Sequence, residues 1–128
     1  MQIRTIALPW TTITVNTTTD TFFPSSGWSP AAGFDEARGT WESIAKIGNI
    51  EIAPAYQVAN TTDDSSPSSF PVATPVGTTG VNWPSGAWHN AKPNTEDMQL
   101  VRTGWIARLT QAGEGTIRVG GSIDVKTL

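Results

Sequence analysis

Near the C-terminus, strict alternation of apolar and other residues is the feature that most constrains the fold of this chain. From Val101 to Leu109, and again from Ile117 to Val125, apolar side chains recur at almost every second position. A period of two is typical of a strand with one buried face, and no apolar repeat of the helical kind is sustained in the chain. The side chains expected on the buried face are Val101, Trp105, Leu109, Ile117, Val119, Ile123 and Val125.

A short glycine-bearing segment, residues 111–115, separates these two runs and predicts an antiparallel hairpin over residues 98–127. On the outer face, this hairpin pairs Arg102 with Asp124 but sets Arg108 against Arg118. Like charges directly opposite one another are unfavourable. Either the register differs, or these two arginines meet an acidic partner.

A second alternating stretch runs from Asn49 to Asn60 and predicts another strand. Pro54 lies within it and cannot donate to a ladder, which indicates an edge strand or a bulge at that point. One face is expected to carry Ile50, Ile52, Pro54, Tyr56 and Val58, and the other Asn49, Glu51, Ala53, Ala55 and Gln57.

The N-terminal half predicts further strands at residues 2–8, 11–19 and 41–47. Gly48 and Asn49 follow the last of these and form a hairpin-turn signature. A single helical turn is expected over residues 34–38, because two acidic residues suit a first turn and a glycine follows.

Length, charge and composition limit the class of protein. At 128 residues the chain is expected to be one domain, residues 1–128. The strands and the polar, breaker-rich stretches between them (22–33, 60–80 and 89–97) predict an all-β, antiparallel, jelly-roll-like β-sandwich with long loops.

The charge distribution gives no indication of nucleic-acid binding, because the net charge is −3 and the Lys and Arg residues are scattered and form no basic patch. We expect no membrane span and no signal peptide, hence synthesis in the host cytoplasm.

Residues capable of chemistry do not form a recognisable motif. His89 is the single histidine, cysteine is absent, and no serine stands in a nucleophile-elbow setting. Asp63 and Asp64 lack the spacing of a calcium loop. The spacing of the other carboxylates considered gives no indication of a catalytic pair; these are Asp35, Glu36, Glu42, Glu51 and Glu96. We therefore predict no enzyme activity, no metal site and no cofactor.

Six tryptophans are a large share for a chain with a single tyrosine. Trp41 and Trp105 lie on strand-like runs and are expected in the core. The others lie beside proline or glycine in expected turns, where an indole can stack on a sugar, cover a sheet end or anchor a neighbouring subunit. These turn tryptophans are Trp10, Trp28, Trp83 and Trp88.

The turn between Trp83 and Trp88 contains Pro84-Ser85-Gly86 and can bring both indoles onto one side. A sugar site usually pairs aromatic rings with several polar groups, and here only Asn82, His89 and Asn90 are nearby. The sequence therefore favours packing or subunit contact over a sugar platform in this stretch.

Two segments, residues 41–60 and 101–128, resemble the closing strands of small β-sandwich virion proteins of tailed bacteriophages, the capsid decoration or cement proteins. The resemblance lies in a strand studded with Gly, Trp and Arg, a glycine-rich turn and an alternating last strand. It implies a non-enzymatic sandwich, often trimeric, that lies over capsid subunits and holds the shell against internal pressure. No residue role transfers from it to a numbered position.

The resulting prediction is a structural virion protein that forms a homo-oligomer, such as a trimer, and binds the major capsid protein. The predicted contact residues are Trp10, Trp28, Trp83, Trp88, His89, Arg108 and Arg118. The alternative is a carbohydrate-binding module on a similar sandwich. Such a module is expected to be monomeric and to bind a glycan through exposed tryptophans.

Overall fold

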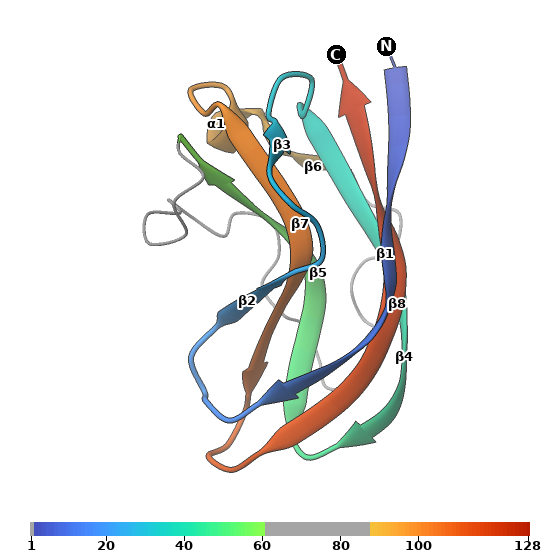
Figure 1. Cartoon of the computed structure of the whole chain (residues 1–128), viewed down its shortest axis with the longest axis vertical. Coiled ribbons are helices and arrows are strands. Elements are labelled where there is room, and N and C mark those ends of the chain that lie inside the picture. Colours follow the sequence, from blue (N-terminus) through green and yellow to red (C-terminus); the bar gives the residue numbers. More distant parts are fainter. Residues whose placement is uncertain (1, 61–87) are drawn as a thin grey trace.

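A computed structural model describes residues 2–60 and 88–128, which form two antiparallel sheets packed face to face (Figure 1). Sheet A has the order β1 (Gln2–Val15), β8 (Gly115–Thr127), β4 (Glu36–Ile47) and β6 (His89–Asn90). In sheet B, β7 (Leu100–Leu109) pairs with β2 (Thr21–Pro24), β3 (Ser29–Pro30) and β5 (Ile50–Ala59). The one helical element in the described ranges is the turn α1 (Lys92–Thr95).

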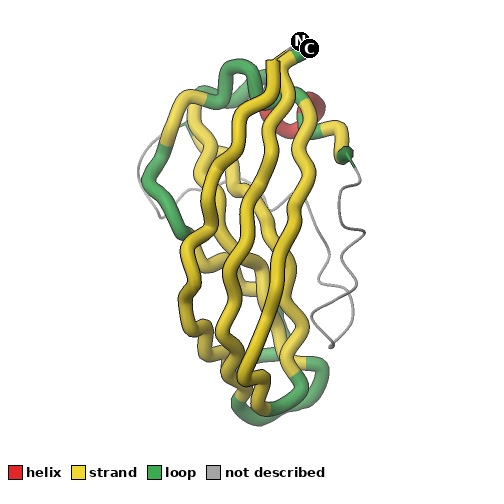
Figure 2. The backbone as a smooth tube through the Cα atoms, turned by 90° about the vertical axis from the view of Figure 1, so that its right-hand side faces the viewer, coloured by secondary structure: helices red, strands yellow, loops and turns green. Residues whose placement is uncertain are grey.

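The strand pairs are nested. The first strand, β1, pairs with the last, β8, while β2 pairs with β7 and β4 with β6. The connections from β1 to β2, from β4 to β5 and from β7 to β8 all pass from one sheet to the other. This winding is the arrangement of a jelly roll, so the predicted all-β antiparallel sandwich is confirmed. Figure 2 shows the long strands of sheet A side by side.

Residues at alternate positions of both sheets fill the space between them. Trp105, Tyr56 and Phe34 are the largest fully buried side chains. The Trp105 ring meets Trp41 edge to face at 5.9 Å between centroids, and Phe34 lies 4.9 Å from Tyr56. Trp41 is partly buried against this core. Both tryptophans expected in the core therefore pack there.

The predicted hairpin over residues 98–127 is wrong, although the residues expected to be buried are buried. Val101, Trp105, Leu109, Ile117, Val119, Ile123 and Val125 all belong to the core. However, β7 pairs within sheet B and β8 within sheet A. Alternation indicates that one face of a strand is buried, but it does not indicate which strand pairs with it. The glycine-bearing segment after Leu109 is an arch between the sheets.

The turn at Gly48 and Asn49 is also an arch between sheets, not the hairpin predicted for it. Ile47 pairs with Thr116 in sheet A, whereas Ile50 pairs with Leu109 in sheet B. Gly48 has a φ of +85°, and a Cβ there would lie 2.6 Å from the Glu114 carbonyl oxygen. The position therefore requires glycine both for its backbone angle and for its close approach to the second arch.

Residues 34–38 do not form the expected helical turn. Phe34 is buried, and β4 begins at Glu36, which pairs with Lys126 of β8. From Glu36 to Arg38 only the middle residue, Ala37, is buried. Ladder pairing and burial therefore override a local preference that acidic residues alone suggest.

The two strands predicted in the first nineteen residues are one strand, β1, which ends at Val15. Its register with β8 shifts between Leu8, opposite Gly121, and Thr11, opposite Val119. Pro9 and Trp10 occupy this β-bulge. Pro9 has no N–H to give to a ladder, and a bulge on the edge strand β1 is a position where a proline is tolerated.

The predicted alternation of β5 holds, because Ile50, Ile52, Tyr56 and Val58 belong to the main core. The ladder with β7 runs through Pro54, opposite Trp105, without a register shift, so there is no bulge. Among the described strands, β5 pairs with β7 alone.

Two of the expected loops contain regular elements. Part of β2 and all of β3 lie within 22–33, while β6 and α1 lie within 89–97. The third, 60–80, lies almost entirely outside the described residues. No helix within 2–60 and 88–128 has the length and hydropathy needed to cross a bilayer.

Candidate functional site

The outer face of sheet A carries most of the exposed large hydrophobic side chains in the described ranges. Four of the five lie on this face: Ile3, Trp10, Ile44 and Ile47. The β8 residues beside them (Lys126, Gly120, Arg118 and Thr116) alternate with the core residues of that strand. All four side chains therefore point away from the core. We call this surface the Trp10 face. Exposed apolar surface of this kind commonly marks an interaction site.

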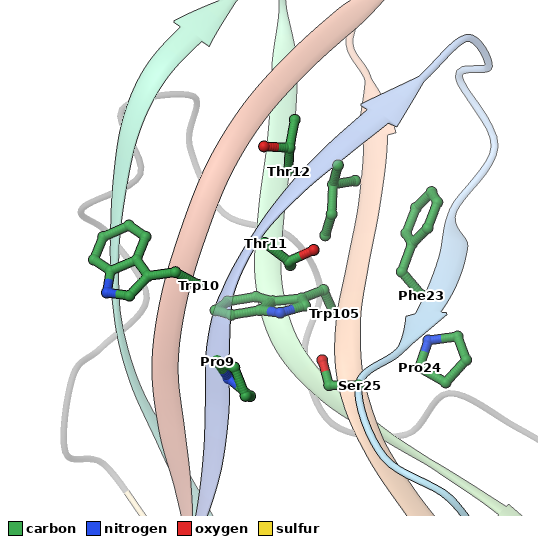
Figure 3. Close-up of a pocket in the computed structure, with 9 residues that line it drawn as sticks. Pro9, Trp10, Thr11, Thr12, Phe23, Pro24, Ser25 and Trp105 are labelled. Atoms are coloured by element: carbon green, nitrogen blue, oxygen red, sulfur yellow. The ribbon is translucent and has the colours of Figure 1, made fainter.

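Trp10 is the centre of the Trp10 face. The bulge at Pro9 turns its indole outward, and Figure 3 shows the ring on the opposite side of β1 from Trp105. The ring lies against Gly120, because a Cβ there would fall within 2.6–2.8 Å of three ring atoms. With 45% of the residue exposed, the sheet supports the ring while its outer part meets solvent.

Polar groups surround the Trp10 ring. Glu42 lies opposite Gly120 in the ladder between β4 and β8. Thr40 and Ser122 share a hydrogen bond of 3.1 Å, and the Arg118 guanidinium lies 5.9 Å from the ring centroid. A hollow of about 560 Å³ borders Trp10, Thr40, Glu42 and Gly120. This arrangement combines an aromatic anchor with both signs of charge and with hydroxyl groups.

Trp88, expected as a contact residue, packs on its own chain. Its ring lies 4.4 Å from the Arg38 guanidinium carbon and 4.0 Å from Lys126 Nζ. Lys126 also pairs with Glu36 at 3.5 Å. Trp88 therefore covers two cations on the outer face of sheet A, at the end of the Trp10 face near β6. Trp83, its predicted partner in a tight turn, lies outside the described residues.

Asp124 anchors Arg38, one of the two cations under Trp88. The Thr5 hydroxyl donates to Asp124 Oδ1 at 2.7 Å, and Arg38 Nε donates to Oδ2 at 2.8 Å. The hydrogen bond from Thr5 and the neighbouring Arg38 hold the pKa of Asp124 below its ordinary value, against the opposing effect of desolvation. The pairing of Arg102 with Asp124 predicted from the hairpin is wrong.

His89 lies in β6 opposite Ala37, and its ring centroid is 6.4 Å from that of Tyr56. Its Nε2 atom is buried and has no hydrogen-bond partner among the described residues. Desolvation lowers the pKa of this imidazole. His89 is thus a neutral residue at the margin of the core.

Trp28 lies on the outer face of sheet B. The Arg102 guanidinium carbon is 4.4 Å from the centre of the Trp28 ring and 5.7 Å from that of Phe22. Arg102 Nε also donates to Gln57 Oε1 at 2.8 Å. Nearby, Ala53, Ala55 and Ile106 are buried in a second cluster with Phe22. This outer face is therefore largely buried, unlike the Trp10 face.

Arg108 and Arg118 do not face one another, contrary to the register predicted for the hairpin. Arg108 lies on the outer face of sheet B, where it pairs with Asp20 at 3.4 Å and with Glu51 at 3.6 Å. Arg118 lies in sheet A. The acidic partners of Arg108 thus come from its own chain, and of the two arginines only Arg118 belongs to the Trp10 face.

The five carboxylates considered in the sequence are spread over the fold. Glu36 and Glu51 pair with different basic residues, Glu42 lies beside Trp10, and Asp35 and Glu96 border a separate hollow next to α1. Within residues 2–60 and 88–128, no group of three or more His, Asp or Glu side chains is placed to hold a metal ion. Asp63 and Asp64 lie outside these ranges.

Sequence reasoning placed Trp10 in a turn, because Pro9 precedes it. The sequence signal for its true position is the spacing between the apolar residues on either side of it. Leu8 and Ile13 are both buried. In a regular strand, residues five positions apart point to opposite faces, so a one-residue bulge must lie between them.

Comparison of the chain with known protein families, curated proteins and solved structures finds no match.

Proposed function

We propose that this chain is a structural virion protein of the capsid decoration type, which binds the major capsid protein through the Trp10 face. The observation that carries the proposal is that one open sheet face holds four of the exposed large apolar side chains of the described residues: Ile3, Trp10, Ile44 and Ile47. Tryptophan and arginine are common anchors of protein interfaces, and Trp10 has Arg118 beside it. The support that Gly120 gives to the ring reduces the entropy that an anchor loses on binding.

The test is sedimentation of the purified chain with empty shells made from the major capsid protein encoded in the same genome. The wild-type chain should sediment with the shells. Trp10→Ala should weaken binding about tenfold or more, since an anchor residue contributes at least about 1–2 kcal/mol. Leu128→Ala is the matched control, because Leu128 is exposed and apolar but lies at the C-terminus beyond β8.

Failure of the wild-type chain to bind shells would contradict the proposal. Equal binding by Trp10→Ala and wild type would contradict the role of the Trp10 face. Circular dichroism of each variant should retain the β-rich spectrum, so that a loss of binding is not a loss of fold.

A carbohydrate-binding module is the second candidate, and the hollow beside Trp10 favours it. An exposed indole bordered by Thr40 and Glu42 also suits the face of a sugar ring. This candidate predicts a monomer whose glycan binding disappears in Trp10→Ala and which does not sediment with shells.

A further inference from the structure

A second concave site lies on the other side of β1 from the Trp10 ring. Here the edge of β1 in sheet A approaches β2 in sheet B, and the side chains leave a cleft of about 450 Å³ (Figure 3). Residues 9–13 of β1 form one wall, Phe23 to Ser25 form the other, and Trp105 of β7 lies between them. The volume is within the usual range for small-molecule sites.

Trp105 supplies a hydrogen-bond donor that the described chain does not use. The residue is fully buried, yet its Nε1 atom has no hydrogen-bond partner. A buried donor left unpaired costs about 1–3 kcal/mol, and buried indole N–H groups are usually satisfied. Nε1 is covered in this structure, so a ligand must displace part of the rim before its acceptor atom removes this cost.

The lining of the cleft selects the chemistry of a ligand. None of its side chains is charged. Thr11 and Ser25 bring hydroxyl groups, while Pro9, Phe23 and Pro24 bring apolar surface. A ligand that matches this lining is neutral, carries several hydroxyl groups and has an apolar C–H face. These are the properties of a neutral sugar ring.

An added peptide strand does not fit the cleft equally well. Strand addition depends on a row of free backbone N–H and C=O groups along a sheet edge. Pro9 and Pro24 have no N–H, and the bulge at Trp10 interrupts the regular edge of β1. The edges beside the cleft are therefore poor templates for a further strand.

We propose that this cleft is a binding site for a neutral carbohydrate of one or two pyranose rings, held by the Trp105 Nε1–H and the hydroxyl groups of the rim. The proposal goes beyond the decoration function and does not rest on it. It also differs from the second candidate function, because the sugar lies between β1 and β2 and does not lie on the exposed Trp10 ring.

The experiment is a titration of the ¹⁵N-labelled full chain, followed by the indole N–H signals in heteronuclear NMR spectra. The probes are the methyl pyranosides of glucose, galactose, mannose and N-acetylglucosamine, together with maltose, lactose and cellobiose. At least one probe should shift the Trp105 signal saturably, with a Kd on the order of 1 mM. The absence of any saturable shift with every probe, up to about 50 mM, would overturn the proposal.

Two variants locate the site. Ser25→Phe fills the rim of the cleft and keeps the backbone hydrogen bond from Ser25 N–H to the Thr103 carbonyl, 2.9 Å long. It should raise the Kd about tenfold or more. Trp105→Phe, read by the backbone amide signals of β1, should do the same by removing the donor. Ser29→Phe is the control, because Ser29 is exposed and lies outside the cleft.

Unchanged affinity in Ser25→Phe would overturn the proposal, and so would a sugar that shifts the Trp10 signal and leaves the Trp105 signal in place. Because the test uses no capsid component, its failure leaves the sedimentation experiment unaffected. Ser25→Phe is the decisive variant if Trp105→Phe folds poorly, since the Ser25 side chain is exposed.

Discussion

At the scale of single residues, replacement of the Trp105 side chain tests the core. Trp105→Ala should lower the free energy of unfolding by about 3–5 kcal/mol, because a fully buried indole leaves a cavity when it is removed. Urea unfolding followed by circular dichroism measures the change. A midpoint equal to that of the wild type would show that the ring is not buried in solution.

Alternation in the sequence predicted the burial of single residues but not their contacts. It identified Trp105 as a core residue because strand phase alone places it inward. It did not indicate that Trp10 points outward, because a bulge changes the phase within β1. Nor could it indicate that Arg108 pairs with Asp20 and Glu51, since these partners depend on which strands pair.

His89 gives a prediction for pH. Desolvation lowers its pKa from the ordinary value of 6.5, so below that pH the unfolded chain binds the proton more readily than the folded chain. Stability should therefore fall as the pH drops from about 7 to about 5. Thermal unfolding at these pH values should show less of this fall in His89→Gln, which does not titrate.

Parallel curves for the two proteins would contradict the assignment to His89. Asp124 does not confuse the test, because its pKa is lowered from 3.8. Its contribution to stability is present above that value and is lost at lower pH, as the pH falls through the lowered pKa. The two effects occupy different ranges of pH.

At the scale of strands, the sequence predicted most elements but not their partners. The period of two marked β5, β7 and β8, because each buries one face against the opposite sheet. The two short glycine-bearing turns suggested hairpins, since they are short enough for direct return. Both instead lead across the sandwich. Local turn signals cannot separate these outcomes, because the choice depends on pairing between β1 and β8 at opposite ends of the chain.

The glycine pair in β8 tests the packing of strands in sheet A. A Cβ on Gly121 would lie 2.1 Å from the Thr40 carbonyl oxygen, so β4 would have to move. The three atoms nearest to a Cβ on Gly120 would all belong to the Trp10 ring, a side chain that can rotate away. Gly121→Ala should therefore destabilise the protein by about 1–3 kcal/mol or more, and Gly120→Ala by less.

Urea unfolding compares the two variants, and the Trp10 indole N–H signal reports on its surroundings. Gly120→Ala should shift that signal although it costs little stability. Equal stability losses for the two variants would mean that β4 and β8 are not as closely paired as their register indicates.

At the scale of the whole molecule, the two faces of the sandwich differ. The outer face of sheet B buries Ala53, Ala55 and Ile106, while the outer face of sheet A leaves four large apolar side chains exposed. The sequence predicted a sandwich with contact residues in its turns. It could not predict that the open surface is a sheet face, because that requires knowing which strands share it.

This asymmetry leads to a prediction about assembly. When no capsid protein is present, the exposed apolar side chains of the Trp10 face can be buried instead by a symmetric contact between copies, so we expect the free chain to form a homo-oligomer. Light scattering coupled to size exclusion should give a multiple of the monomer mass of 13.6 kDa.

Trp10→Ala combined with Ile44→Thr should shift the protein toward the monomer, because the two substitutions remove apolar side chains from the same face. Trp88→Ala is the comparison, since Trp88 packs on Arg38 and Lys126 of its own chain. If Trp88→Ala alone dissociates the oligomer, the contact lies at the edge beside β6. If the wild type is a monomer at high concentration, the Trp10 face does not bind a second copy in solution.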